Sequence, residues 1–231
     1  MTKIKICGIT RPEEIEYLNE ANVDYAGFVI YEKSKRYITV ERAAAMAQNL
    51  NENIKKVAVT VSPDVELLKE IEKNGFDIIQ VHRGLSKDLL NAAEIPVWYA
   101  INVEDTGQTK MTLEWMRSLP IMLGSKIRAL LIDAPEFGSG QTFDWEKSKR
   151  QLKAGMLSPP LEDDLFSRKL ILAGGLDASN VAEGIEIFSP YIVDVSSSVE
   201  GENGKDKDKI LDFVHAVRDY DMKDERQESD E

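Results

Sequence analysis

The sequence predicts an α/β protein in which eight strand–helix units close into a single (β/α)8 barrel. Three observations support this fold: a length of 231 residues, apolar runs that alternate with helical patterns, and eight repeats of that alternation. Such barrels take about 250 residues, and their parallel strands are buried on both faces. The runs expected to form strands span residues 4–7, 25–30, 57–61, 78–82, 97–101, 129–133, 170–173 and 191–195.

The segments between these runs carry signals of helix starts. Thr10-Arg11-Pro12-Glu13-Glu14 combines a capping residue, an early proline and carboxylates, all favoured at helix N-termini. Ser62-Pro63-Asp64 repeats the arrangement, and Asp177-Ala178-Ser179-Asn180 opens a later helix. Residues 151–167 are the least regular part, and we expect a loop there that leads into the seventh strand.

An open doubly wound sheet would show the same alternation. The count of eight favours the TIM barrel, as do the polar residues that follow many strands rather than one switch point. Nothing in the sequence resembles a linker between domains. We therefore expect one barrel domain over residues 1–218, followed by an acidic tail over 219–231 that is solvated and disordered.

Composition excludes several classes of partner. The formal net charge of −12 argues against binding to nucleic acid or to an anionic membrane surface, since both require clustered cations. No apolar run approaches the roughly 18–20 residues that span a bilayer, and the first residues show no signal-peptide pattern. With one cysteine no intrachain disulfide is possible, so we expect a cytoplasmic protein.

The C-terminal ends of barrel strands meet at one rim, where the following loops build the active site. Gly174-Gly175 follows the seventh run and Ser196–Ser198 follows the eighth. Glycine lets the backbone approach an anion closely, and these two loops often form the phosphate site of such barrels. Either loop alone would be read as a simple turn or helix cap. Together they predict a site for a small phosphorylated substrate.

Two further strand ends carry residues suited to proton transfer. A lone cysteine in a strand is more often an inert core residue. Cys7, however, ends its strand beside Gly8, where partial exposure and a positive potential would lower its pKa from about 8.5 and make it a usable base. Asp133 ends the sixth run, and a partly desolvated carboxyl there would suit proton donation. A role as a turn or cap carboxylate is the alternative for Asp133.

Two other polar residues near the rim can each have either of two roles. Arg36 lies between Lys33 and Tyr37, and it is either a solvated loop charge or a bidentate clamp for a carboxylate. His82 is equally well read as a structural histidine or as a ligand contact. Two distant histidines and one cysteine supply no set of metal ligands, so we expect no metal site.

These motifs, in this order, resemble the phosphoribosylanthranilate isomerase family of tryptophan biosynthesis. The resemblance extends over about residues 3 to 218, and the ordered set is far more specific than any single motif. The residues that carry it are Lys5-Ile6-Cys7-Gly8-Ile9-Thr10, Gly27-Phe28-Val29, Lys33-Ser34-Lys35-Arg36-Tyr37, Leu131-Ile132-Asp133-Ala134, Gly140-Gln141-Thr142-Phe143-Asp144-Trp145, Leu172-Ala173-Gly174-Gly175-Leu176 and Asp194-Val195-Ser196-Ser197.

The resemblance implies an Amadori rearrangement of N-(5-phosphoribosyl)anthranilate, with Cys7 as general base and Asp133 as general acid. It further implies that Arg36 holds the anthranilate carboxylate and that the two rim loops hold the phosphate. No cofactor is implied, because the anthranilate nitrogen supplies the electron sink. The complete set of substrate-binding residues expected is Arg36, Gln80, His82, Gly174, Gly175, Asp194, Ser196, Ser197 and Ser198.

Four positions depart from the family's usual pattern. Lys35 replaces a proline, Arg83 is inserted before Gly84, and Gln141 replaces a lysine. Ser198 replaces a glycine, which puts a side chain beside the expected phosphate. Arg83 and Lys35 add positive charge near the rim, which would compensate.

Two alternative functions make different predictions for this sequence. A related barrel isomerase of histidine biosynthesis should have an aspartate at the end of the first strand, whereas this chain has Cys7. A non-catalytic barrel kept as a binding module is disfavoured by the presence of Cys7, Asp133 and Arg36 together. The acidic tail is the only segment that suggests a protein partner, and the sequence does not indicate which one.

Overall fold

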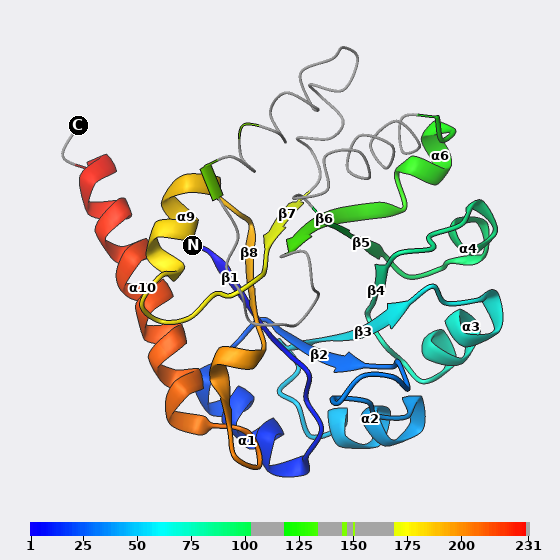
Figure 1. Ribbon diagram of the computed structural model, residues 1–231, viewed down its shortest axis with the longest axis horizontal. Coiled ribbons are helices and arrows are strands. Elements are labelled where there is room, and N and C mark those ends of the chain that lie inside the picture. The colour runs from blue at the N-terminus through cyan, green and yellow to red at the C-terminus, as the bar shows by residue number, and fades with distance from the viewer. Residues whose placement is uncertain (103–117, 134–144, 147–149, 151–168, 230–231) are drawn as a thin grey trace.

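The computed structural model describes residues 1–102, 118–133, 145–146, 150 and 169–229. Eight parallel strands form a closed barrel, in which each strand pairs with the next and the eighth pairs with the first (Figure 1). The barrel predicted from the sequence is confirmed. The strands are β1 (Lys3–Cys7), β2 (Tyr25–Val29), β3 (Lys55–Val61), β4 (Ile78–His82), β5 (Val97–Asn102), β6 (Ile127–Asp133), β7 (Lys169–Leu172) and β8 (Ile192–Val195).

Helices surround the barrel, and the last of them, α10, packs against both α1 and α9 (Figure 1). Among the described residues, no helix has the length and apolar character needed to cross a membrane. A short 3-10 turn, η1 (Ser197–Val199), and a two-stranded hairpin, β9 (Glu200–Gly201) with β10 (Gly204–Lys205), follow β8. The α-helices among the described residues are α1 (Pro12–Ala21), α2 (Val40–Ala47), α3 (Val65–Lys73), α4 (Lys87–Ala92), α6 (Ile121–Gly124), α9 (Val181–Phe188) and α10 (Lys207–Ser229).

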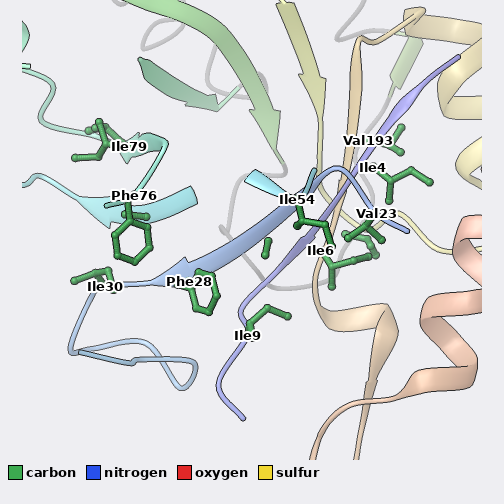
Figure 2. Packing of buried hydrophobic residues seen from close by; sticks show 14 of the residues in the cluster. Ile4, Ile6, Ile9, Val23, Phe28, Ile30, Ile54, Phe76, Ile79 and Val193 are labelled. Carbon is green, nitrogen blue, oxygen red and sulfur yellow. The ribbon is translucent and has the colours of Figure 1, made fainter. Parts of the chain in front are cut away.

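Successive side chains of each strand point to opposite faces, and this alternation separates an outer core from the barrel interior. In β1, Ile4 and Ile6 belong to the outer layer under the helices, whereas Cys7 belongs to the inner one. Figure 2 shows part of the outer layer, where Ile4 lies beside its register partner Val193 of β8. The inward positions are therefore the ones available to a site inside the barrel.

Aromatic packing strengthens the outer layer at β2. The rings of Phe28 and Phe76 meet edge to face, with centroids 6.0 Å apart and planes at 81° (Figure 2). Both side chains are almost fully buried. Such pairs contribute about 0.5–1.5 kcal/mol beyond the burial of their area. The contact joins β2 to the segment that leads into β4.

The helix-start signals read from the sequence correspond to observed helices. Pro12 begins α1, and the carboxylate of Glu14 accepts hydrogen bonds from the amide nitrogens of Thr10 and Arg11 at 2.7 and 3.1 Å. Asp64 caps α3 by accepting the amide of Leu67 at 2.8 Å. Each carboxylate satisfies N–H groups that have no partner within the helix. The expected loop at residues 151–167 lies outside the described residues.

The C-terminal segment differs from the sequence expectation. Helix α10 continues to Ser229, so the expected domain boundary at residue 218 falls inside it. Asp221 is buried, and its carboxylate accepts hydrogen bonds from the amide and hydroxyl of Thr2 at 2.8–3.1 Å. Arg218 donates to the Thr2 carbonyl at 2.6 Å. The start of the acidic segment therefore fastens the last helix to the first residues of the chain.

We predict that Asp221→Ala lowers the free energy of unfolding by about 1–3 kcal/mol, because the buried amide and hydroxyl of Thr2 lose their acceptor. Urea unfolding followed by circular dichroism measures this change. Asp219→Ala is the matched control, since Asp219 is exposed on the same helix. Equal stabilities for the two variants would contradict the role assigned to Asp221.

Candidate active site

A cavity of about 410 Å³ opens at the C-terminal ends of the strands. It collects side chains from separate strands and loops, as expected for the rim of a barrel. All of the residues predicted to act on or bind the substrate line it, with the exception of Ser198. Those that line it are Cys7, Arg36, Gln80, His82, Asp133, Gly174, Gly175, Asp194, Ser196 and Ser197.

Three residues of the predicted site are placed by their positions at strand ends: the proton-transfer candidates Cys7 and Asp133, and His82, which was predicted to contact the substrate. Cys7, His82 and Asp133 are the last residues of β1, β4 and β6. Each is an inward position, and all three line the cavity although they are distant in sequence. All three side chains are also largely buried, which keeps them away from bulk water. The barrel thus brings a thiol, an imidazole and a carboxyl to one enclosed space.

A buried ion pair lies next to Cys7. Lys5 Nζ contacts Asp194 Oδ2 at 2.7 Å, and their side chains are 0% and 7% exposed. The two residues are register partners on β1 and β8, the strands that close the barrel. Burial disfavours charge on Lys5, but Asp194 and Cys7 outweigh it, so the pKa of Lys5 is raised. Lys5 therefore stays charged in the barrel interior.

The surroundings of Cys7 shift the pKa of its thiol in opposite directions. Burial has the largest effect and raises the pKa of the thiol. The positive charge of Lys5 lowers this pKa, the negative charge of Asp194 raises it, and the positive charge of Lys205 lowers it. The net shift is upward, opposite to the direction expected from the sequence, because desolvation outweighs the two cations. Gly27 of β2 leaves the room required, since a Cβ there would lie 2.9 Å from Cys7 Sγ and 3.2 Å from Lys5 Cε.

Gln80 and His82 form a second buried pair on β4. Gln80 Nε2 lies 2.7 Å from His82 Nε2, so one end of the amide is fixed. Burial, together with the charges of Lys5 and Arg83, lowers the pKa of His82 to about 3, and the imidazole is neutral at physiological pH. Gln80 Oε1 is buried and has no hydrogen-bond partner among the described residues. Gln80 lines the cavity, and the described residues leave this acceptor unsatisfied.

Arg36 reaches the cavity from the loop between β2 and α2. Its Nε donates to Glu200 Oε1, and Glu200 Oε1 lies 3.1 Å from Lys205 Nζ. Lys205 Nζ also donates to the carbonyl of Ser196 at 2.8 Å. The guanidinium is largely buried, and Gly8 gives it room because a Cβ there would overlap Arg36 Cδ. A charged network therefore joins the loops after β2 and β8.

The loops after β7 and β8 both line the cavity, as expected of the loops predicted to bind phosphate. Gly174 and Gly175 have φ values of 86° and 67°, a backbone conformation that side chains disfavour. Ser196 lies on the facing loop, where its hydroxyl donates to the carbonyl of Cys7 at 2.9 Å. Ser198 differs from the expectation, because its hydroxyl donates to the carbonyl of Leu176 and it does not line the cavity. The serine that replaces glycine thus links the two loops.

Comparison with known proteins matches this arrangement to one family. The model of the N-(5'-phosphoribosyl)anthranilate isomerase family matches residues 4–216. An N-(5'-phosphoribosyl)anthranilate isomerase of Streptococcus pneumoniae (strain Taiwan19F-14) is 39% identical over 219 residues, covering 94% of this chain and 96% of that protein. The chain belongs to this isomerase family. The resemblance read from the motifs is confirmed.

Solved structures agree with the family and the fold. The phosphoribosyl anthranilate isomerase of Thermus thermophilus superposes with a TM-score of 0.76 at 26% identity, covering 94% of this chain and 99% of that one. A phosphoribosyl anthranilate isomerase in complex with reduced 1-(o-carboxyphenylamino)-1-deoxyribulose 5-phosphate gives 0.73 at 28% identity, covering 95% and 100%. That relative binds a phosphorylated small molecule that carries an aromatic carboxylate.

The structure shows where two of the residues that depart from the family pattern lie. Lys35 is exposed, and its Nζ lies 3.2 Å from Glu200 Oε2. Arg83 is exposed, lines the cavity and has a φ of 63°. Gln141 and its motif lie outside the described residues. Both described cations therefore lie at the cavity or its charged network, as expected from the sequence.

Sequence reasoning missed three charged residues that contact the lining of the cavity: Lys5, Glu200 and Lys205. A signal for Lys5 was present, because a lysine two residues before Cys7 in an apolar strand must face the same side of the sheet. Lys205 lies in a run of alternating lysines and acidic residues, where nothing distinguishes it from a solvated charge. Its side chain is nevertheless only 1% exposed.

We predict that alkylation of Cys7 by iodoacetamide has a pH midpoint above the ~8.5 of an ordinary thiol, because burial raises its pKa. Only the thiolate reacts, and Cys7 is the only cysteine, so mass spectrometry reads its rate directly. The same chain unfolded in urea is the control and should show the ordinary midpoint. A native midpoint at or below the unfolded one would contradict the environment described.

Proposed function

We propose that this chain catalyses the Amadori rearrangement of N-(5-phosphoribosyl)anthranilate to 1-(2-carboxyphenylamino)-1-deoxyribulose 5-phosphate. The observation that carries the proposal is that Cys7 and Asp133 share one cavity with the loops after β7 and β8. An acid, a base and an anion cradle are what an isomerase of a phosphorylated sugar requires. Membership of the isomerase family supports the same reaction.

In the first step we assign Asp133 as general acid. Its carboxyl protonates the furanose ring oxygen, and the bond from that oxygen to C1′ breaks. The lone pair of the anthranilate nitrogen forms the double bond of an iminium ion, so no cofactor has to accept electrons. Positioned proton transfer of this kind typically contributes ~10²–10⁴-fold to the rate. The partial burial of Asp133 keeps water from competing for its proton.

In the second step we assign Cys7 as general base. The thiolate removes the proton from C2′, and the electron pair of that bond forms the enolamine while the iminium nitrogen becomes neutral. Loss of the hydroxyl proton at C2′ and protonation of C1′ then give the ketone. The overall change is an internal oxidation of C2′ and reduction of C1′, so atoms and electrons balance within the substrate.

The raised pKa of the Cys7 thiol is compatible with this role. An iminium cation forms next to the sulfur in the first step, and a positive charge at short distance in a buried site strongly favours the thiolate. Lys5 already contributes in the same direction. A thiol that acts as a base must stay reduced, and we therefore infer that the enzyme works in a reducing compartment such as the cytoplasm.

For binding, we propose that Arg36 takes the anthranilate carboxylate and that Gly174, Gly175, Ser196 and Ser197 take the phosphate. Backbone N–H groups and hydroxyls at such loops are suited to phosphate oxygens. The sugar would then lie between these two ends. The remaining cavity residues assigned to the substrate are Gln80, His82 and Asp194.

Gln80 Oε1 and Asp194 Oδ1 support binding of a sugar. Both atoms are buried and have no hydrogen-bond partner among the residues that the structure describes. Leaving a buried acceptor unsatisfied typically costs about 1–3 kcal/mol, so a ligand that donates to it gains affinity. Ribose hydroxyls are donors of this kind. The neutral His82 fixes the amide of Gln80, and Lys5 fixes the carboxylate of Asp194.

We predict that the purified protein consumes phosphoribosylanthranilate, and that Cys7→Ala or Asp133→Asn lowers kcat by about 10²–10⁴-fold, because each removes one proton transfer. Loss of substrate fluorescence measures the rate. Circular dichroism and binding of the reduced product analogue show that each variant is folded and keeps its site. An inactive wild type would overturn the proposed function, and near-wild-type turnover in both variants would overturn the mechanism.

A further inference from the structure

Glu200 is the centre of a cluster of cations beside the cavity. Its Oε1 accepts a hydrogen bond from Arg36 Nε and lies 3.1 Å from Lys205 Nζ, while its Oε2 lies 3.2 Å from Lys35 Nζ. Burial favours the neutral acid, but the hydrogen bond from Arg36 and the charge of Lys205 lower the pKa of Glu200 to about 2. Glu200 is thus a carboxylate at neutral pH, and it does not line the cavity itself.

The backbone that carries Glu200 is fastened to several neighbouring elements. Glu200 pairs with Lys205 in the hairpin of β9 and β10. Its carbonyl accepts a hydrogen bond from Lys209 of α10 at 2.7 Å, and the amide of Lys205 donates to Glu14 of α1 at 2.7 Å. Lys205 Nζ donates to the carbonyl of Ser196 on the loop after β8. The hairpin is therefore a fixed support for whatever its carboxylate holds.

Arg36, in contrast, projects from a loop and depends on that support. Within its own loop, its amide donates to the hydroxyl of Ser34 at 3.1 Å. Its side chain is 12% exposed, and its guanidinium is bound through Nε by Glu200. Nη2 is buried and has no hydrogen-bond partner within the described part of the chain, and Arg36 lines the cavity. Nε of the guanidinium is held by Glu200, and the neighbouring donor Nη2 is left for a ligand.

We propose that Glu200 is a positioning residue, which holds the guanidinium of Arg36 through Nε and so directs Nη2 to the aromatic carboxylate of the substrate. A guanidinium is planar and rigid, so fixing Nε fixes the directions of its other N–H groups. Charge-assisted hydrogen bonds of this geometry are short and strong. The inference rests on the proposed function, because it takes Arg36 as the group that binds the carboxylate.

The loss of Glu200 should change the affinity for a carboxylate-bearing ligand in opposite directions, depending on whether its negative charge or its hold on Arg36 matters more. Removing a negative charge near the cavity should strengthen the binding of any anionic ligand. Loss of the hydrogen bond to Arg36 Nε should instead weaken a ligand that carries the carboxylate and leave a ligand without it unharmed. The preference between two such ligands therefore separates the two effects.

The experiment measures dissociation constants by calorimetry for two ligands on the purified full-length chain. The first is reduced 1-(o-carboxyphenylamino)-1-deoxyribulose 5-phosphate, and the second is the same molecule without its carboxyl group. We expect Glu200→Ala to reduce the preference for the first ligand by roughly tenfold or more, and Glu200→Gln to reduce it less, because the amide oxygen still accepts one hydrogen bond. The second ligand should bind as tightly as before or more tightly.

Two controls make the outcome specific. Glu202 is exposed in the same hairpin, and Glu202→Ala removes an equal charge without touching Arg36, so it should leave the preference unchanged. In an Arg36→Met background, Glu200→Ala should cause no further loss of preference, as a double-mutant cycle requires for residues that act through one another.

An unchanged preference in Glu200→Ala, or equal weakening of both ligands, would overturn the positioning role. If Glu200→Ala fails to fold, Glu200→Gln decides instead, because it should still lower the preference below that of the Glu202→Ala control, and an equal preference in the two variants would overturn the positioning role. The proposed function fails separately, by an inactive wild type in the fluorescence assay, whereas failure of the positioning role leaves wild-type turnover intact.

Discussion

The ion pair between Lys5 and Asp194 is the interaction on which the site depends. It joins β1 to β8, the two strands that close the barrel, and lies in the interior beside the cavity. Taking two charges out of water costs several kcal/mol each, and only good geometry recovers that cost. The 2.7 Å contact supplies such geometry, but Asp194 keeps Oδ1 without a partner among the described residues. A pair built for stability alone would leave no acceptor unsatisfied.

The charge of Lys5 acts on more than its partner. It opposes the upward shift in the pKa of Cys7 and contributes to the low pKa of His82. One buried cation therefore favours the thiolate on β1 and a neutral imidazole on β4. The backbone makes this possible through strand alternation, which points Lys5 and Cys7 to the same side of β1 while Ile4 and Ile6 pack outward.

Much of this arrangement was predictable from the sequence. Parallel strands that end at a common rim bring Cys7 and Asp133 together whatever their separation in sequence, and both residues were recognisable as the ends of apolar runs. The glycine pair at residues 174–175 was recognisable because its freedom of backbone conformation has a clear use near an anion. These predictions depend on where strands end and on the backbone freedom of glycine, and short stretches of the sequence indicate both.

The remainder depends on contacts that no local pattern contains. Glu200 holds Arg36 across 164 positions of sequence, and its partner Lys205 resembles a solvated charge. Asp221 was read as part of a solvated tail because its neighbours are acidic, yet it is buried against Thr2. Ser198 was expected at the phosphate, but its hydroxyl faces the carbonyl of Leu176. In each case tertiary hydrogen bonds, and not the composition of the segment, decide where the side chain lies.

In the proposed mechanism one cavity binds the two anionic ends of the substrate on separate loops, with Cys7 and Asp133 between them. A crystal structure of this chain with reduced 1-(o-carboxyphenylamino)-1-deoxyribulose 5-phosphate tests it most directly. We expect the phosphate at the loops after β7 and β8, the carboxylate at Arg36, and C2′ next to the sulfur of Cys7. A ligand bound in the reverse direction, or outside this cavity, would contradict it.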